Sequence, residues 1–164
     1  MYRFVFLILM TSLSLNGQEI EQKKIPDLSI ELLNRTKTTI QELVSDGPLI
    51  IDFWATWCEP CKKEMVHLEE INQKYADKGL TILAISQDSP KSLSKVKSFI
   101  RSKRYSFKVG LDPNQQIGQK LGAQLLPTTI IVDKDLNIVW RHQGYLPGDE
   151  MDIEEQVITL LHEE

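Results

Sequence analysis

The feature that most constrains the fold is an apolar strand that runs directly into a pair of cysteines. Gly47 and Pro48 open the run LIIDFWA at residues 49–55, whose near-continuous apolar character is typical of a strand buried on both faces. The sequence WCEPC follows at 57–61, and beyond it apolar side chains recur at spacings of three and four. This spacing predicts a helix over about residues 60–77. The two cysteines therefore lie where a buried strand gives way to a helix.

The rest of the chain alternates between strand and helix patterns. Beyond those around the cysteines, an N-terminal strand pair is predicted at residues 28–33, and strands at 80–86, 128–132 and 138–141. Helices are predicted at residues 89–104, 114–121 and 150–161. This alternation predicts the α/β class. One domain is expected, because a chain of 164 residues buries roughly 70% of its unfolded surface.

The N-terminus has the composition of a targeting segment. Residues 4–15 (FVFLILMTSLSL) follow a positive charge and match the core of a secretory signal, and they fall short of the roughly 20 residues that span a bilayer. The alternatives are an uncleaved anchor or a buried strand. We expect export to the periplasm or cell envelope. The predicted division of the chain is a signal peptide at 1–17, a linker at 18–26 and a folded domain at 27–164.

The charge of the chain bears on its partners. The formal net charge is −4 and the isoelectric point is near 5.5. Acidic and basic residues look well mixed along the sequence. These features give no electrostatic reason to expect nucleic acid or an anionic membrane as a partner.

The cysteines Cys58 and Cys61 allow three interpretations. A structural disulfide across so short a loop would remove little chain entropy. Zinc needs four ligands, but His67, His142 and His162 are scattered and are expected to be surface residues, so no metal is predicted. A copper site made of both cysteines and one histidine stays as an alternative.

A redox-active pair is the third interpretation. Cys58 would lie at the N-terminus of the predicted helix, where unpaired N–H groups and the helix dipole favour a thiolate. Cys61 falls on the apolar stripe of that helix, and residues three apart on a helix are within disulfide reach. We therefore expect Cys58 to be an exposed nucleophile and Cys61 a shielded resolving thiol.

These residues resemble a known family. The motif DFWATWCEPCKKE at 52–64, together with the predicted signal peptide, is similar to the TlpA/ResA type of exported thiol–disulfide reductase, which has a thioredoxin-like fold. The sequence LPTT at 126–129 matches the family's cis-proline, which implies that Pro127 lies beside the cysteines. The separation of Cys61 from Pro127 implies a helix–strand insertion at about residues 88–122. The implied architecture is a central mixed sheet flanked by helices, with this insertion and an N-terminal strand extension.

The resemblance also implies a function and its partners. It implies a protein-disulfide reductase that needs no cofactor and acts on client proteins with disulfides or thiols. An upstream thiol protein embedded in the membrane would supply electrons, and the reductase would be a monomer. Client contacts are implied for Trp57, Pro60, Leu126 and Pro127, although the Trp57 ring could instead belong to the core. The alternatives are a thiol oxidase or isomerase, a copper chaperone, and a thiol peroxidase, whose PxxxTxxC motif is absent.

Two carboxylates are candidates for proton transfer. Asp52 is the one charged residue of the apolar strand, so burial should raise its pKa and let it accept the proton of Cys61. It matches the buried acid of thioredoxin, whereas the TlpA/ResA type often has a neutral residue there. Glu64 matches the glutamate that follows the motif in the TlpA/ResA type. It would tune the pKa of the thiols, or be a solvated residue of the first helical turn.

Overall fold

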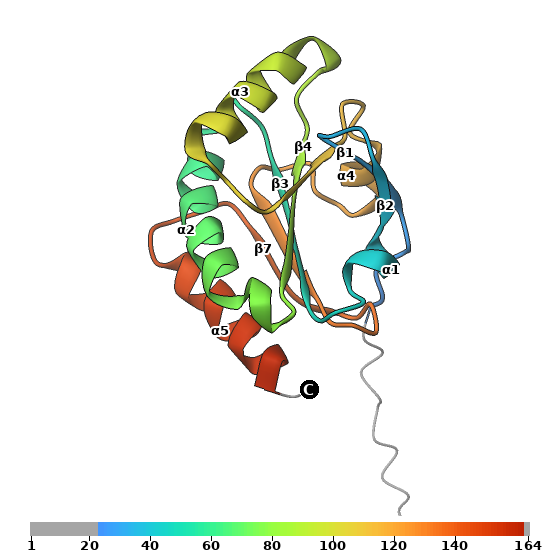
Figure 1. Ribbon diagram of the computed structural model, residues 1–164, viewed down its shortest axis with the longest axis vertical. Helices are drawn as coiled ribbons and strands as arrows, with labels where there is room; N and C mark the ends of the chain where they lie inside the picture. Colours follow the sequence, from blue (N-terminus) through green and yellow to red (C-terminus); the bar gives the residue numbers. More distant parts are fainter. Residues whose placement is uncertain (1–22, 163–164) are drawn as a thin grey trace, which may run out of the picture.

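A seven-stranded mixed sheet runs through the centre of the molecule in the order β2-β1-β5-β4-β3-β6-β7. The computed structural model (Figure 1) describes residues 23–162. The strands are β1 (Ser29–Leu32), β2 (Lys37–Thr39), β3 (Leu49–Trp54), β4 (Thr81–Ser86), β5 (Lys108–Leu111), β6 (Thr128–Val132) and β7 (Ile138–Gln143). The helices are α1 (Ile40–Leu43), α2 (Glu59–Tyr75), α3 (Leu93–Lys103), α4 (Gln116–Lys120) and α5 (Asp149–His162).

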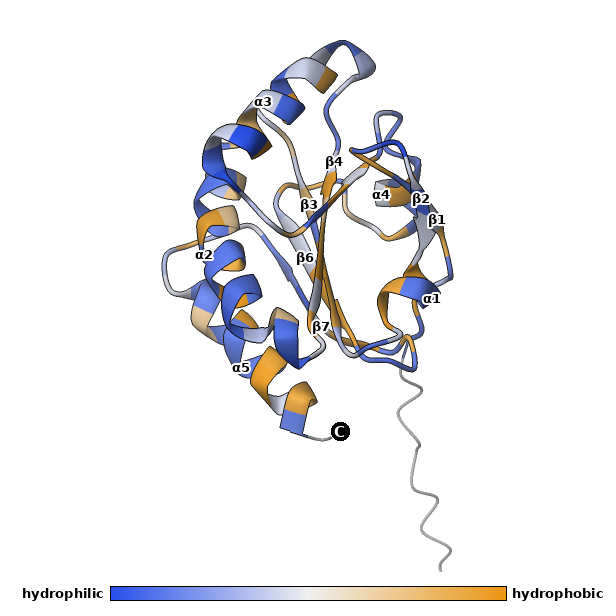
Figure 2. Cartoon of the chain, in the orientation of Figure 1, coloured by the Kyte–Doolittle hydropathy of each residue, from blue (hydrophilic) through white to orange (hydrophobic). Residues whose placement is uncertain are grey.

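Helices cover both faces of this sheet, as the α/β prediction requires. Apolar residues of α2, α3 and α5 form one buried cluster against the sheet, and those of α1 and α4 belong to a second cluster on the other face. Figure 2 shows the apolar colours in the central strands and hydrophilic colours on much of the outer helical surface. The division of the core into two layers follows from strands whose side chains alternate between two buried faces.

Strand β3 is the centre of the sheet. All of its residues are buried, and it pairs in parallel with β4 and antiparallel with β6. Ile50 and Trp54 belong to the cluster under α2, whereas Ile51 and Phe53 belong to the cluster under α1 and α4. The prediction of a strand buried on both faces is confirmed.

The predicted elements flanking the sheet are largely confirmed. Helix α2 is followed by a 3-10 turn at Ala76–Lys78, and the chain then turns at Gly79, where φ is 102°. A side chain at Gly79 would meet the Asp46 carbonyl at 2.3 Å, so glycine is required by space as well as by backbone conformation. The inserted segment contains α3, β5 and α4, as the family resemblance implied.

Three elements were not located from the sequence. The first is β2, which pairs with β1 but lies beyond the predicted strand pair at residues 28–33. Strand β5 has only four residues, and its Gly110 weakens the strand pattern, although a side chain there would meet Ile30 at 2.9 Å. Helix α1 is a single turn, but Thr39 and Glu42 form a complete capping box at its start. The motif T-x-x-E could therefore have identified the start of α1.

The folded domain begins earlier than the predicted boundary at residue 27. Ile25 is 2% exposed and its backbone N–H donates to the carbonyl of Leu136 at 2.8 Å, while Lys24 forms a bridge with Asn137. Residues 23–26 are therefore part of the domain and not of the predicted linker, because Ile25 fills the apolar layer beside the β6–β7 hairpin. The predicted signal peptide lies outside the described residues.

Between residues 23 and 162, none of the helices combines the length and the apolar character needed to cross a membrane.

Candidate active site

Cys58 lies where β3 gives way to α2. Its backbone N–H donates to the carbonyl of Ala55 at 3.0 Å, which closes the turn after Trp54. Cys58 is the N-cap of α2, with φ −87° and ψ 102°, and Pro60 stands in the first turn. Unpaired N–H groups and the helix dipole favour negative charge at this end of a helix. The position therefore suits a thiolate once the cysteine is reduced.

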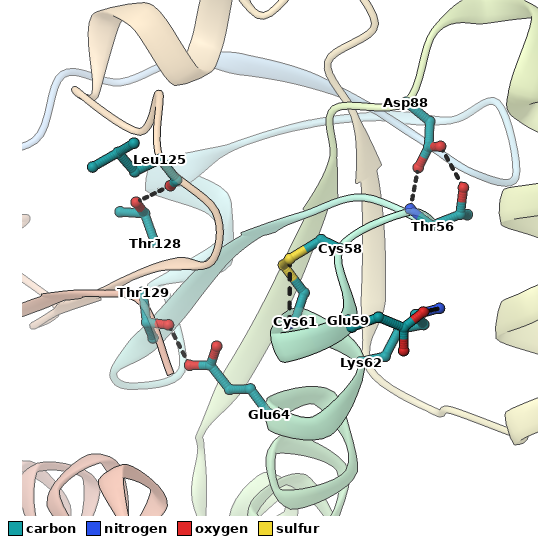
Figure 3. The surroundings of a disulfide bond; sticks show 10 residues. All are labelled: Thr56, Cys58, Glu59, Cys61, Lys62, Glu64, Asp88, Leu125, Thr128 and Thr129. Atoms are coloured by element: carbon teal, nitrogen blue, oxygen red, sulfur yellow. Dashed lines mark hydrogen bonds and ion pairs between the residues drawn. A yellow bond between two sulfur atoms is a disulfide. The ribbon is translucent and has the colours of Figure 1, made fainter. Parts of the chain in front are cut away.

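The two cysteines form a disulfide, shown in Figure 3, with their Cα atoms 5.4 Å apart. The backbone N–H of Cys61 also donates to Sγ of Cys58 at 3.3 Å. Cys61 is fully buried, as predicted, but Cys58 is only 5% exposed, so the expectation of an exposed Cys58 is wrong for the oxidised pair. The Cys58 side chain turns inward to bond Cys61 and joins the same apolar cluster. Faster reaction of Cys58 in the reduced pair stays a prediction.

Asp88 holds the loop that carries Cys58. One oxygen of its carboxylate accepts hydrogen bonds from the Thr56 backbone N–H at 2.8 Å and the Ser86 hydroxyl at 3.0 Å. The other oxygen accepts from the Thr56 hydroxyl at 2.6 Å (Figure 3). Asp88 follows the end of β4, so these bonds fix the cysteine loop to the neighbouring strand.

Asp52 is the buried acid that the sequence predicted. It is completely buried in β3, and neither carboxylate oxygen has a hydrogen-bond partner among residues 23–162. Desolvation raises the pKa of Asp52 well above its usual range, and the charge of Glu64 raises it further. Burial therefore shifts the equilibrium of the Asp52 carboxyl towards the protonated form, and the carboxyl can accept a proton only when it is ionised.

Glu64 is the second buried acid of the site. It is 1% exposed, and its Oε1 accepts a hydrogen bond from the Thr129 hydroxyl at 2.6 Å (Figure 3), whereas Oε2 has no partner in the described part of the chain. Desolvation raises the pKa of Glu64 to about 7, the Thr129 bond opposes this shift, and the charge of Asp149 adds to it. The interpretation of Glu64 as a solvated residue is therefore wrong. A role in tuning the thiols stays a prediction.

The sheet register connects these groups in a row. Asp52 pairs with Thr129 across β3 and β6, and Thr129 pairs with His142 across β6 and β7. Residues paired in this way point to the same face of a sheet, which is the face covered by α2 and Glu64. The side chain of His142 is 41% exposed and its Nε2 lies 3.2 Å from the Asp149 carboxylate. A line of polar groups thus runs from the buried Asp52 to solvent.

The peptide bond between Leu126 and Pro127 is cis, as the family resemblance implied. The Pro127 carbonyl accepts a hydrogen bond from the Gly144 N–H at 2.9 Å. The backbone N–H and carbonyl of Leu126 make no hydrogen bond to any other described residue. Leu126 packs against the apolar cluster that contains both cysteines. Its free backbone groups are therefore available to an extended peptide beside the disulfide.

Exposed apolar side chains flank the same region. Trp57 is 67% exposed, so the alternative of a core role for its ring is wrong. Leu125 is 65% exposed (labelled in Figure 3), and Pro60 is also exposed. Large apolar side chains on the surface beside a reactive group are typical of a binding surface for a polypeptide.

The charged residues near the cysteines are few. Glu59 is exposed and makes an ion pair with Lys62, one turn further along α2. His67 and His142 are half-buried and His162 is exposed. His67 lies 3.3 Å from the Glu70 carboxylate and His142 lies 3.2 Å from the Asp149 carboxylate. Among residues 23–162, no group of three His, Cys, Asp or Glu side chains is placed to hold a metal ion.

Sequence reasoning missed Asp88, Thr129 and Leu125. Asp88 follows β4 at the same edge of the sheet where the cysteines follow β3, and polar residues at adjacent carboxyl ends of parallel strands are a usable indication of a site. Leu125 neighbours the predicted client-binding pair and could have been included. Thr129 depends on a cross-strand register that the sequence does not give.

Comparison with known proteins supports the interpretation of this site. A family model described as Redoxin matches residues 20–157. The chain is 34% identical over 117 residues to "Thiol-disulfide oxidoreductase ResA" of Bacillus thuringiensis (strain Al Hakam), covering 71% of this chain and 66% of that protein. It is 32% identical over 132 residues to "Thioredoxin-like protein YneN" of Bacillus subtilis (strain 168), covering 80% of this chain and 76% of that protein.

A solved structure extends the comparison to the fold. The solution structure of an uncharacterized thioredoxin-like protein from Porphyromonas gingivalis superposes with a TM-score of 0.72 and 29% identity, covering 85% of this chain and 92% of that one. The thioredoxin-like fold expected from the sequence is therefore confirmed.

Proposed function

This chain belongs to the Redoxin family and carries the CxxC disulfide of a thiol–disulfide oxidoreductase, and we propose that it is an exported reductase of disulfides in client proteins. The observation that carries the proposal is the Cys58–Cys61 disulfide at the N-terminus of α2. The strand that leads to it carries Asp52, which has no hydrogen-bond partner among residues 23–162. Related proteins named thiol-disulfide oxidoreductase ResA support the same activity.

The reaction follows from the two positions of the cysteines. In the reduced enzyme the Cys58 thiolate attacks one sulfur of a client disulfide, forms a mixed disulfide, and releases the other client sulfur as a thiolate. Cys61 then loses its proton and attacks Sγ of Cys58. This second step releases the client's remaining sulfur as a thiolate and leaves the Cys58–Cys61 disulfide. Two electrons pass from the enzyme to the client.

Asp52 is the proposed acceptor of the Cys61 proton, and Glu64 is proposed to tune the thiols. Both carboxyls are buried on the face of the sheet that α2 covers. The raised pKa of Glu64, about 7, gives this acid a protonation equilibrium in the neutral range. Thr129 is bonded to Glu64 and paired with Asp52, so it orients one acid and neighbours the other.

Glu59 favours reduction over oxidation of clients. A strong thiol oxidant stabilises its thiolate, whereas the acidic Glu59 between these cysteines opposes a thiolate, and its exposed pair with Lys62 offsets this only in part. We expect a reduction potential closer to thioredoxin's, roughly −270 mV, than to the roughly −120 mV of a strong oxidant. A redox titration that places the potential above about −150 mV would overturn the proposed reductase function.

The proposed clients bind along Trp57, Pro60, Leu126 and Pro127, with Leu125 added to the surface. A client strand would hydrogen-bond the free backbone groups of Leu126 in the manner of an added β-strand. The proposed location is the periplasm or cell envelope, with an upstream thiol protein in the membrane as the electron donor. This part of the proposal depends on the signal-like composition of residues 1–17 and on the named relatives.

Cysteine variants test the proposed function. Cys58→Ser should abolish the reduction of insulin disulfides, because the attacking sulfur is lost. Cys61→Ser should accumulate mixed disulfides with clients in the native host, where mass spectrometry would identify them. An active Cys58→Ser variant, or a Cys61→Ser variant that traps no client, would contradict the proposal.

A further inference from the structure

Helix α3 and its flanks carry charge of a single sign that the net charge of the chain conceals. The charged residues between Asp88 and Asp112 are all basic: Lys91, Lys95, Lys97, Arg101, Lys103, Arg104 and Lys108. The formal charge of the whole chain is −4, so the remaining residues are strongly acidic. The expectation of evenly mixed charges is wrong here, because a whole-chain composition averages over a helix that gathers the basic residues.

These basic side chains are exposed and unneutralised. All of them are exposed, and none makes an ion pair with a carboxylate of residues 23–162. The nearby Glu69 is 8% exposed, and its oxygens accept hydrogen bonds from the backbone N–H and hydroxyl of Ser106. Figure 2 shows α3 mainly in hydrophilic colours. The positive potential over α3 is thus directed at solvent.

A groove of about 640 Å³ lies beside the C-terminal half of α3, bordered by β5 and the turn between β1 and β2. Its basic lining comes from Lys97, Arg101, Arg104 and Lys108, and its apolar lining includes Leu33, Ile100 and Phe107. Lys97, Arg101 and Arg104 also line a hollow of about 570 Å³ along the outer side of the helix. The groove therefore offers cations above an apolar floor.

Aromatic rings fix this groove relative to the active-site strand. Trp54 at the end of β3 lies 5.4 Å from Phe99 of α3, measured between ring centroids. Phe99 lies 6.0 Å from Tyr105, and Tyr105 lies 5.0 Å from Phe107 in the groove. The packing of these rings holds α3 and β5 in one position against the strand that leads to the cysteines.

We propose that this groove binds an extended acidic segment of a partner protein, with apolar side chains between its carboxylates. The basic side chains of the groove would pair with the carboxylates of the segment, and the apolar residues that line the groove would contact its apolar side chains. Helix α3 has 11 residues and is about 16 Å long at 1.5 Å per residue. An extended segment covers that length with about five residues. The interaction needs no disulfide chemistry, so it goes beyond the proposed reductase function and stands independently of it.

The observations favour a polypeptide over a bilayer or a nucleic acid. The exposed large apolar side chains of the described residues lie elsewhere, so α3 has none to insert between lipids. A flat membrane would also leave the groove unfilled. Recognition of single-stranded nucleic acid usually adds aromatic side chains that stack on bases, and the aromatic residues of this groove are packed against one another.

A binding experiment tests this proposal. The probe is a labelled, cysteine-free peptide of glutamate and leucine residues, titrated with the full folded domain and followed by fluorescence anisotropy. We expect saturable binding at low salt that weakens at high salt, because exposed charges are screened. The double variant Lys97→Glu/Arg101→Glu should bind about tenfold more weakly, since two attractive pairs become repulsive.

Matched controls separate this site from net charge and from the redox centre. Lys24→Glu/Lys120→Glu makes the same change in net charge at exposed positions away from α3, and it should bind like the unaltered protein. All variants should reduce a small neutral disulfide at the same rate. Equal binding by both double variants, or no binding at low salt, would overturn the proposal. Tighter binding to phosphatidylglycerol vesicles or to single-stranded DNA, with the same dependence on Lys97 and Arg101, would also overturn it.

Discussion

Two buried carboxyl sites at the centre of this protein are built in opposite ways. Asp88 is 5% exposed, and its two oxygens accept hydrogen bonds from Thr56 and Ser86. Asp52 is completely buried two strand positions before the end of β3 and has no partner among residues 23–162. Glu64 resembles Asp52, because within the described part of the chain only one of its carboxylate oxygens accepts a hydrogen bond. Both oxygens of the Asp88 carboxylate thus accept hydrogen bonds, whereas the Asp52 and Glu64 carboxyls have one hydrogen bond between them among residues 23–162.

The difference separates a structural acid from a chemical one. Hydrogen bonds to an ionised carboxylate stabilise its charge and tie it to fixed neighbours, so Asp88 can hold a loop in place. A buried carboxyl without donors favours its protonated form and costs folding free energy when it ionises. Such a group is retained in a stable protein where a proton must be moved. We therefore expect substitution of Asp88 to affect stability, and substitution of Asp52 to affect chemistry.

The largest expected effect is on the rate of the step in which Cys61 attacks the mixed disulfide at Cys58. This rate should depend on Asp52 and not on Asp88. Asp52→Asn should slow the decay of a Cys58-linked mixed disulfide about a hundredfold, within the usual range for loss of a general base. The variant should stay folded and become more stable at neutral pH, because the fully buried carboxyl of Asp52 is no longer there to ionise. Stopped-flow measurement of the decay across a range of pH would test this.

Asp88→Asn is the matched control for that measurement. It keeps an oxygen acceptor near Thr56 and should change the decay rate by only a few-fold. If Asp52→Asn decays as fast as the unaltered protein, Asp52 has no part in the proton transfer.

The next largest effect concerns stability against pH. The pKa of Glu64 is about 7 in the fold, against an ordinary value of 4.5. Between these values the folded state binds more protons than the unfolded state, so stability falls as pH rises and then levels off above about pH 7. The loss is of the order of 3 kcal/mol at 1.36 kcal/mol per pKa unit. The raised pKa of Asp52 acts in the same direction.

Urea denaturation of the oxidised protein between pH 4.5 and pH 8 would measure this loss. Glu64→Gln should flatten the profile over this interval. Glu155→Gln removes an exposed carboxylate of α5 and should leave the slope as it is. A profile that rises with pH in the unaltered protein would contradict the assignment of Glu64 as a buried, protonated acid.

The burial of these acids was predictable to different degrees. A charged residue inside LIIDFWA has to be buried if the strand is, so the position of Asp52 followed from the sequence. Glu64 lies three residues after Cys61 and four before Leu68, both on the apolar stripe of α2, so its burial could also have been inferred. Its charge led to the opposite interpretation, because most glutamates near a helix start are solvated.

The partners of the acids were not predictable in the same way. Thr129 reaches Glu64 only because β6 pairs with β3 in one register, and a shift of one residue would point it to the other face. Asp88 bonds Thr56 across 32 positions of sequence. The cysteine pair, the cis-proline and the order of the main elements have local patterns, whereas these contacts depend on the assembled sheet.

A smaller effect is expected from removing the structural acid. Asp88→Ala should lower the free energy of unfolding by about 2 kcal/mol, because the Thr56 N–H and the Thr56 and Ser86 hydroxyls lose their acceptor. Asp27→Ala is the control, since Asp27 is exposed and accepts one backbone N–H from Gln41. It should cost less than about 1 kcal/mol. Equal losses in the two variants would show that the Asp88 bonds add nothing beyond those of an exposed acid.

The smallest effect should come from Thr129, whose hydroxyl donates the one hydrogen bond that the Glu64 carboxylate accepts from residues 23–162. The Thr129 hydroxyl lowers the pKa of Glu64 against the effect of burial. Thr129→Val keeps the shape and removes the donor, so the pKa of Glu64 should rise and the pH at which stability levels off should move upward. The expected change in the free energy of unfolding is about 1 kcal/mol, the usual contribution of one hydrogen bond.

Thr129→Ser is the control, because it keeps the hydroxyl and loses a methyl group. It should show the same profile of stability against pH as the unaltered protein, even where it lowers stability. If Thr129→Val and Thr129→Ser give the same profile of stability against pH, the hydroxyl does not affect the pKa of Glu64. Burial alone would then account for the raised pKa of this carboxyl.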